Sequence, residues 1–237
     1  MKRFILLLWA TMVVHYSYGQ KNETILSLNS GLFSFRGASA EANSQINLSP
    51  DGTTGYTNNP FGARPGLSYG LSFQVQRITK GNFILGVSLG VENLRSKTSI
   101  TQVNGVTTAG TFQNQASGQT HLSNNFINGF PFIGYRFAVR QLAIDLTGGI
   151  DIGYLINSKE QGKAIGQNGE PYSASVDRTL IKSDVRPRLQ VSACYGKIGA
   201  YVGYSYGLIN YRSGWVGGTN ECYSELVRFG LMYKIKS

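Results

Sequence analysis

The chain has 237 residues and a formal net charge of +10, from 22 Lys and Arg against 12 Asp and Glu. The basic residues are scattered and form no run, so the charge does not predict a nucleic-acid partner. Only 14% of the residues are charged and 30 are glycine, a balance too poor in Lys and Glu for a sheet whose polar face is bathed in water.

Residues 1–19 have the features of a secretory signal peptide. Lys2 and Arg3 precede the apolar run Phe4–Val14, and small residues follow up to Gly19. The apolar run is too short to span a bilayer, so cleavage is expected and an uncleaved membrane anchor is the alternative. Residues 20–237 are expected to form a single domain. Without Lys2 and Arg3, 20 basic residues remain against 12 acidic ones, a net charge of +8.

Alternation of apolar and polar residues predicts eight strands in residues 20–237. In the segment that begins at Ile198, the residues Ile198, Val202 and Leu208 share one face, while Gly199 and Gly203 share the other. This period of two is the geometry of a β-strand. In chain order, the expected strands cover residues 24–36, 67–78, 83–95, 126–138, 142–156, 184–195, 197–210 and 222–235.

The connections between these strands are alternately long and short. The long ones are polar, and the one at residues 96–123 contains Asn104-Gly105 between β-prone runs, which predicts a hairpin that projects beyond the barrel. If that hairpin were two further barrel strands, the count would be ten. Bacterial barrels have short periplasmic turns and longer outer loops. The alternation of long and short connections therefore predicts that both termini are periplasmic.

The polar faces of the expected strands consist mainly of Gly, Ser, Thr and Gln, and aromatic residues gather near the strand ends. A secreted, water-soluble barrel also alternates, but with its apolar side chains inside. Three features favour a membrane barrel over a water-soluble one. One strand face carries small polar residues, aromatic residues lie near the strand ends, and long and short connections alternate strictly. The predicted fold is therefore an all-β, eight-stranded antiparallel up-and-down transmembrane β-barrel.

This architecture and the closing segment Arg228–Ile235 resemble the small OmpA/OmpX-like, porin-family outer-membrane barrels, in the form common in Bacteroidota. The resemblance implies a location in the bacterial outer membrane, with outer-membrane lipid and lipopolysaccharide as surroundings. It also implies that the barrel-assembly machinery is a partner during biogenesis, because that machinery reads such a C-terminal strand. The family is specific for fold and location rather than for activity.

The expected inward faces carry charges of both signs. A lumen of this size is filled by side chains, so these charges are predicted to pair and to plug the barrel. The alternative is an ion path or a ligand site at the barrel mouth. The residues are Glu92, Arg136, Asp145, Asp151, Arg186, Arg188, Arg228 and Lys234.

The run His121-Leu122-Ser123-Asn124 is similar to the His-x-Ser-Asn run of outer-membrane lipid A 3-O-deacylases. The resemblance implies that His121 is the base and Ser123 the nucleophile, two residues apart on one strand face. A carboxylate that orients the histidine is also needed, and Asp145, the next acidic residue, is expected to point into the lumen. Neither a metal-binding cluster nor a cofactor-binding motif is found, and Cys194 and Cys222 are expected to remain unpaired.

The leading functional prediction is a non-enzymatic outer-membrane protein whose barrel is an anchor and whose long loops contact a surface partner, a glycan or lipopolysaccharide. A narrow pore for small solutes and the lipid A deacylase are the alternatives. The aromatic residues expected to serve recognition in the loops are Tyr56, Phe61, Phe112, Tyr172 and Trp215.

Overall fold

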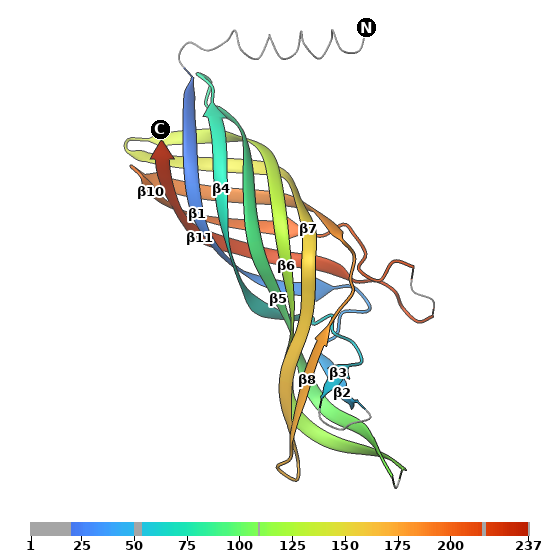
Figure 1. The fold of residues 1–237 in the computed structure, drawn as a ribbon. Helices are drawn as coiled ribbons and strands as arrows, with labels where there is room; N and C mark the ends of the chain where they lie inside the picture. Colours follow the sequence, from blue (N-terminus) through green and yellow to red (C-terminus); the bar gives the residue numbers. More distant parts are fainter. Residues whose placement is uncertain (1–19, 50–53, 109, 215–216, 237) are drawn as a thin grey trace.

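A computed structural model describes residues 20–49, 54–108, 110–214 and 217–236 of the chain, and these are built from strands (Figure 1). The expected signal peptide at residues 1–19 and the expected recognition residue Trp215 lie outside the described residues. No described segment forms a helix that is long and apolar enough to cross a membrane.

A closed ring, the large barrel, is the main feature of the fold. Each strand pairs antiparallel with the next in the ring, and β11 closes on β1 from Thr24↔Lys236 to Arg36↔Tyr223. The prediction of an all-β, up-and-down barrel is confirmed. Within the described residues the ring consists of β1 (Lys21–Arg36), β4 (Arg64–Ile78), β5 (Phe83–Thr107), β6 (Gly110–Val139), β7 (Leu142–Gly166), β9 (Ser183–Tyr195), β10 (Ile198–Tyr206) and β11 (Tyr223–Lys236).

One end of the large barrel is closed by three short turns. Each turn places one residue in the left-handed region that tight hairpins require, namely Asn82 (φ 63°), Arg140 (φ 55°) and Gly196 (φ 58°). The start of β1 and the end of β11 lie at this same end (Figure 1). The long connections all lie at the other end.

Three of the ring strands do not stop at the rim. The far halves of β5, β6 and β7 run on and bend away, and β2 (Asn43–Leu48), β3 (Gly55–Thr57) and β8 (Pro171–Asp177) complete a second ring with them. Its pairings are β2 parallel to β5, β2 antiparallel to β3, β3 parallel to β8 at Gly55↔Ala174, and β8 antiparallel to β7. We call this ring the small barrel.

The hairpin expected within residues 96–123 does project beyond the large barrel, but the expectation of polar loops around it is wrong. Residues 96–123 extend β5 and β6 instead of adding a strand pair, and the turn lies between Thr107 and Gly110, beyond Asn104-Gly105. Residues 157–166 and 171–177 are strands as well. The sequence does not reveal these strand extensions, because their outer face carries polar side chains. The apolar alternation that marks the strands of the large barrel ends where the extensions begin.

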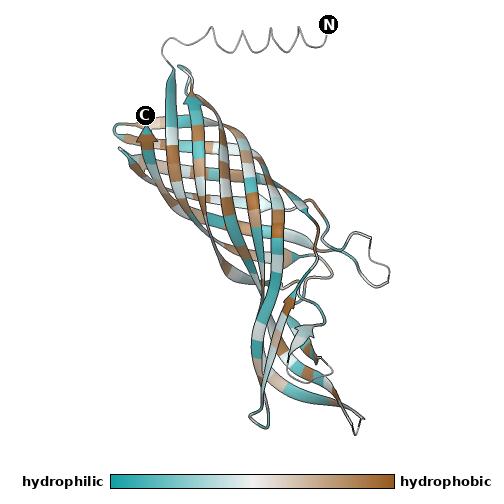
Figure 2. Cartoon of the chain, viewed as in Figure 1, coloured by the Kyte–Doolittle hydropathy of each residue, from teal (hydrophilic) through white to brown (hydrophobic). Residues whose placement is uncertain are grey.

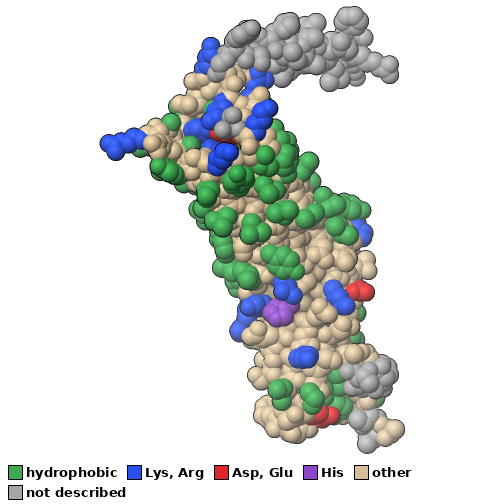
Figure 3. Space-filling view, turned by 60° about the vertical axis from the view of Figure 1, so that its left-hand side comes forward, with side chains coloured by type: hydrophobic (Ala, Val, Ile, Leu, Met, Phe, Trp, Pro, Cys, Tyr) green, Lys and Arg blue, Asp and Glu red, His purple; other side chains and the backbone are tan. Residues whose placement is uncertain are grey.

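The outer surface of the large barrel is apolar, and we call it the apolar belt. Leu28 is 62% exposed and Leu189 is 67% exposed, whereas inward-facing Ser27 and Gln190 are buried. Brown and pale bands alternate along each strand of the large barrel (Figure 2), and hydrophobic side chains cover its outside (Figure 3). Beyond the belt the surface becomes polar.

Inside the molecule, an aromatic plug fills the mouth of the large barrel that faces the small barrel. Phe35 packs edge-on against Phe33, Phe61 and Tyr211 with ring centroids 5.0 to 5.2 Å apart. The small barrel has its own, separate apolar core. The plug comprises Phe33, Phe35, Phe61, Leu94, Leu122, Phe126, Leu155, Tyr211, Cys222 and Leu226. The core of the small barrel comprises Ile46, Ile100, Val103, Ala164, Tyr172 and Ala174.

Candidate functional site

Two clusters of charged side chains occupy the lumen of the large barrel. The first lies near the short turns, and Arg136 is its centre. Its guanidinium donates two hydrogen bonds of 2.6 Å to Asp145 and two of 2.8 Å to Glu23. Lys234 Nζ lies 3.3 Å from Glu23 Oε1, and Gln76 donates to the same carboxylate. The cluster thus balances two cations with two carboxylates.

The second lumen cluster lies in the middle of the large barrel. Arg228 pairs with both Glu92 and Asp151. Arg186 Nη2 is 3.1 Å from Asp151 Oδ2, and its Nη1 is 3.9 Å from Asp184 Oδ2. The cluster thus contains three carboxylates and three guanidinium groups. The third guanidinium group is that of Arg188. Buried charges of opposite sign in equal number are what a filled, dry interior requires.

Arg188 and Arg186 are also held by aromatic rings. The guanidinium carbon of Arg188 lies 4.3 Å from the centroid of Phe130, and that of Arg186 lies 5.4 Å from Phe126. Gly153 makes room for this packing, since a Cβ there would meet both Arg186 Nη2 and the Phe126 ring at 3.0 Å. Ring faces carry partial negative charge and favour cations at this distance.

The eight lumen residues expected from the sequence all lie inside the barrel, but in two separate groups. Arg136, Asp145 and Lys234 belong to the first cluster, and the other five to the second. Glu23 and Asp184 are buried partners outside the set predicted from the alternation. Each continues the inward alternation of its strand by one step, so the periodicity could have identified both.

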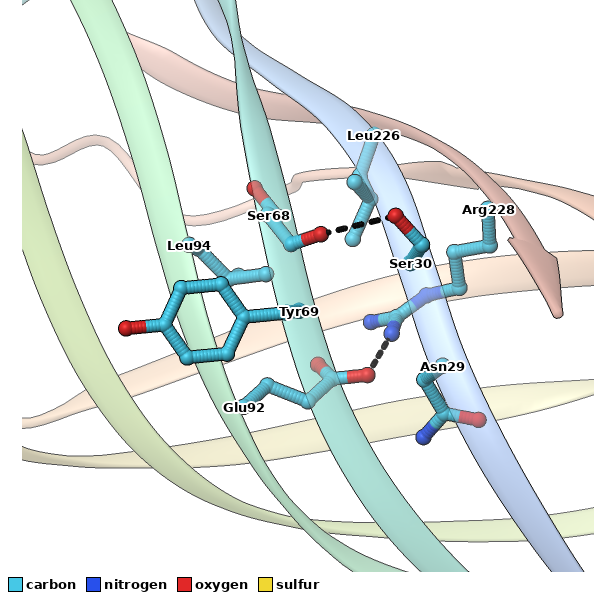
Figure 4. Close-up of a pocket in the computed structure, with 8 residues that line it drawn as sticks. All are labelled: Asn29, Ser30, Ser68, Tyr69, Glu92, Leu94, Leu226 and Arg228. Atoms are coloured by element: carbon cyan, nitrogen blue, oxygen red, sulfur yellow. Dashed lines mark hydrogen bonds and ion pairs between the residues drawn. The ribbon is translucent and has the colours of Figure 1, made fainter.

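A small cavity beside the Glu92–Arg228 pair shows how tightly the lumen is packed (Figure 4). Its volume is about 10 Å³, and Asn29, Ser30 and Leu226 contribute to its wall. The Ser30 hydroxyl donates to the Ser68 carbonyl at 3.0 Å across one side of it. A cavity of this size holds one water molecule at most.

The junction between the two barrels is held by a further buried carboxylate, that of Glu160. Glu160 is fully buried on β7 and accepts a 2.8 Å hydrogen bond from the Thr57 amide of β3. Arg178, just after β8, donates to Glu160 and to the Thr57 carbonyl at 2.6 Å. These contacts fasten β3 and β8 to β7 and thereby close the small barrel.

Two aromatic residues expected to serve recognition are structural instead. Phe61 is 3% exposed in the aromatic plug, and Tyr172 is 7% exposed in the core of the small barrel. Tyr56 is 45% exposed and Phe112 is partly buried. The expectation failed because it treated the segments as loops, whereas they form a packed barrel that needs its own core.

His121 and Ser123 share the outward face of β6, both partly buried. The Ser123 hydroxyl accepts a hydrogen bond from Arg95 Nε at 3.1 Å. Burial, followed by the charges of Arg95 and Lys97, lowers the pKa of His121 below its ordinary 6.5. Asp145, the carboxylate considered for orienting the histidine, pairs in register with Arg136, 15 residues along β6 from His121 and so on the order of 50 Å away. The structure does not bring these three residues together.

Comparisons with known proteins yield distant structural likeness only. No family model matches the chain, and no curated protein matches it. Ail, the attachment invasion locus protein of Yersinia pestis solved with the heparin analogue sucrose octasulfate, is 10% identical, with 91% of this chain and 99% of that chain covered and a TM-score of 0.35. Neisserial surface protein A is 7% identical, with 90% and 97% covered and a TM-score of 0.35. The outer-membrane protease OmpT of Escherichia coli is 12% identical, with 92% and 98% covered and a TM-score of 0.32.

Proposed function

We propose that this protein is an integral, non-enzymatic outer-membrane protein that anchors a second, water-exposed barrel at the bacterial surface. The observation that carries the proposal is the reversal of polarity along β5, β6 and β7. In the large barrel most of their apolar side chains face outward, and in the small barrel most of them face inward. An outward apolar surface suits lipid, and a barrel with an apolar interior and polar exterior suits water.

The long and short connections support an orientation. Short turns such as the one at Asn82 are typical of the periplasmic side of bacterial barrels, and longer excursions are typical of the outside. The small barrel is then extracellular, and both chain ends are periplasmic. We infer that contacts with surface molecules are made by the small barrel and its junction with the belt.

The packing of the lumen supports an anchor over a pore. An ion crossing the large barrel meets two clusters of paired charges and then the aromatic plug. Removing any member of a paired cluster leaves a buried charge uncompensated, so the path resists opening. In a planar bilayer we expect no discrete conductance steps, and regular steps of one size would favour the pore.

The placement of His121 and Ser123 supports the same conclusion for catalysis. A serine nucleophile needs a neighbouring base that is itself oriented by a third group. Here the Ser123 hydroxyl lies against the Arg95 guanidinium, and the lumen holds Asp145. Lipid A from cells that make this protein should keep the same acyl chains as lipid A from cells that make His121→Ala.

Surface labelling with a membrane-impermeant maleimide tests the proposal. Asn168→Cys places a thiol in the exposed turn between β7 and β8, and Lys80→Cys places one in a short turn. The natural Cys194 and Cys222 are buried and give the background. We expect Asn168→Cys to react in intact cells and Lys80→Cys to react only after lysis. The opposite pattern would reverse the orientation, and reaction of neither variant in intact cells would overturn the surface exposure of the small barrel.

A further inference from the structure

Just beyond the apolar belt, the outward face of β5, β6 and β7 changes its chemistry row by row. The last apolar row in register across the three strands is Val91, Ile127 and Tyr154. The next row is a ladder of amides, in which Asn93 donates to Asn125 at 2.7 Å and Asn125 donates to Asn157 at 2.6 Å. Apolar contact therefore gives way to hydrogen-bonding groups within one step of the strand.

The following rows are cationic. Arg95, Ser123 and Lys159 form one row, and Lys97, His121 and Gln161 form the next. Lys163 lies one step further, and Arg64 of β4 is in register with Lys97. Figure 3 shows the histidine surrounded by Lys and Arg side chains at the edge of the hydrophobic surface. We call this set the basic surface; it comprises Arg64, Arg95, Lys97, His121, Lys159 and Lys163.

Within the part of the chain that the structure describes, the cations of the basic surface are not neutralised. None of them forms an ion pair with a carboxylate of the described residues. Asp177, which is in register with Lys159, is the acidic residue beside the surface. The charges of Arg95 and Lys97 act on His121 and help to lower its pKa, the direction expected beside uncompensated positive charge.

The height of the basic surface fits a layer of lipid headgroups. Residues two apart on a strand are about 7 Å apart, so Arg95 and Lys97 lie roughly 13 Å and 20 Å along β5 beyond Val91 of the last apolar row. For strands tilted by about 40°, this corresponds to heights of about 10 Å and 15 Å along the membrane normal. The headgroup and interfacial region adds roughly 5–7 Å on each side of the hydrocarbon core, and the long side chains of Arg and Lys can reach back toward it. The basic rows therefore begin at the outer edge of the headgroup layer, within reach of its phosphates.

We propose that the basic surface binds the phosphate groups of an anionic glycolipid of the outer leaflet, with the amide ladder of Asn93, Asn125 and Asn157 contacting its sugar hydroxyls. This proposal rests on the proposed function, because only a belt embedded in lipid holds the basic surface at headgroup height. Arg95 and Lys97 supply charge to the phosphates, and His121 supplies a ring nitrogen between them.

The surface above the basic rows suits the sugar part of the same ligand. A hollow of about 990 Å³ begins there, on the outer face of the small barrel. Hydroxyls and amides dominate its wall, and these are the groups that bind sugars. Six of the polar residues that line it are Ser99, Thr101, Gln102, Gln115, Ser117 and Gln119.

The test measures binding of bisphosphorylated lipid A to the purified, folded protein in detergent micelles. The variant Arg95→Gln/Lys97→Gln/Lys159→Gln removes three cations from the basic surface. The matched control Lys80→Gln/Arg140→Gln/Lys197→Gln removes three exposed cations from the short turns. We expect the first to weaken binding by roughly tenfold to a hundredfold, and the control by less than about twofold.

Two further probes identify the ligand chemistry. Lipid A stripped of its phosphates should bind the unchanged protein as weakly as intact lipid A binds the triple variant. Phosphatidylglycerol in the same micelles should compete poorly with lipid A. Equal losses in the two triple variants, or undiminished binding of the stripped lipid, would overturn the phosphate site, and equal competition by phosphatidylglycerol would overturn the glycolipid assignment.

Failure of this inference is separable from failure of the proposed function. A barrel that is surface-exposed and closed, as shown by the maleimide pattern and by a band that shifts on boiling, leaves the proposed function intact even if lipid A does not bind. As an internal readout, addition of lipid A should raise the pKa of His121 in the unchanged protein, because a nearby phosphate favours the imidazolium.

Discussion

The large barrel and the small barrel share β5, β6 and β7 but turn opposite kinds of side chain to their surroundings. On β6, even-numbered residues face inward along the whole strand. In the large barrel the outward residues are apolar, as at Ile127 and Ile133. In the small barrel the outward residues are polar, as at Gln119, and the interior is apolar, as at Ile100 and Ala164.

The difference shows that the backbone pattern of a strand does not determine its environment. Period two is satisfied in both regions, and the change occurs across the amide ladder of Asn93, Asn125 and Asn157. The interiors of the two barrels are also stabilised in different ways. The large barrel pairs buried charges, whereas the small barrel removes apolar area from water, at about 25 cal/mol per Å².

The largest expected effect comes from breaking the first lumen cluster. Arg136→Ala leaves Glu23 and Asp145 buried without their main cation. We expect it to lower the free energy of unfolding of the large barrel by about 3–5 kcal/mol. Urea unfolding in lipid vesicles, followed by the band shift on boiling, measures this loss.

Lys21 provides the matched control for that prediction. Its Nζ lies 3.4 Å from Glu23 Oε1, but its side chain is 55% exposed. Lys21→Ala therefore removes an ion pair of the same carboxylate in contact with water, and we expect a loss below about 1 kcal/mol. Similar losses in the two variants would mean that burial does not give the lumen cluster its strength.

A charge placed on the outer face of β5 or β6 compares the two environments directly. Leu89 is 60% exposed on the apolar belt. Leu89→Arg should lower the free energy of unfolding in vesicles by about 2–4 kcal/mol, the cost of a cation on the lipid face of a barrel strand. Gln119→Arg, on the outside of the small barrel, should change it by less than about 0.5 kcal/mol. Tolerance of Leu89→Arg would contradict a lipid-facing belt.

The large barrel could be predicted from the sequence because both of its faces are chemically distinct. Apolar residues such as Leu85 and Leu89 alternate with small or polar ones such as Gly86 and Ser88. Strand starts were placed within a few residues for β1, β4 and β9. The inward charges were found because the same alternation assigns them to the lumen.

The small barrel was missed because its signals are short and weak. Its strands β2, β3 and β8 have between three and seven residues. Its interior is marked by single apolar residues, such as Ile46 and Tyr172, separated by polar ones. The parallel pairing of β2 with β5 joins segments some 55 residues apart, which no local pattern reveals. The basic surface depends on that same extension, since it aligns residues from four strands.

A conservative change in the core of the small barrel tests whether the two barrels unfold separately. Ile46 is fully buried between β2 and its neighbours. Ile46→Val removes one methylene group and should cost about 0.5–1.5 kcal/mol. We expect faster amide hydrogen exchange in β2, β3 and β8, with no change between β1 and β11. Faster exchange in both barrels would mean that they open as one unit.

The smallest effect concerns the charge state of the surface where the two barrels meet. Because the folded-state pKa of His121 lies below 6.5, its ordinary value, the folded protein favours the neutral ring. The stability this contributes is fully present above pH 6.5 and is lost as the pH falls through the lowered, folded-state pKa. Selective ¹³C labelling of histidine should show His121 titrating below 6.5, and Arg95→Gln/Lys97→Gln should bring that pKa closer to 6.5. A pKa unmoved by this double variant would mean that burial alone sets it and that the basic surface exerts no positive field at its centre.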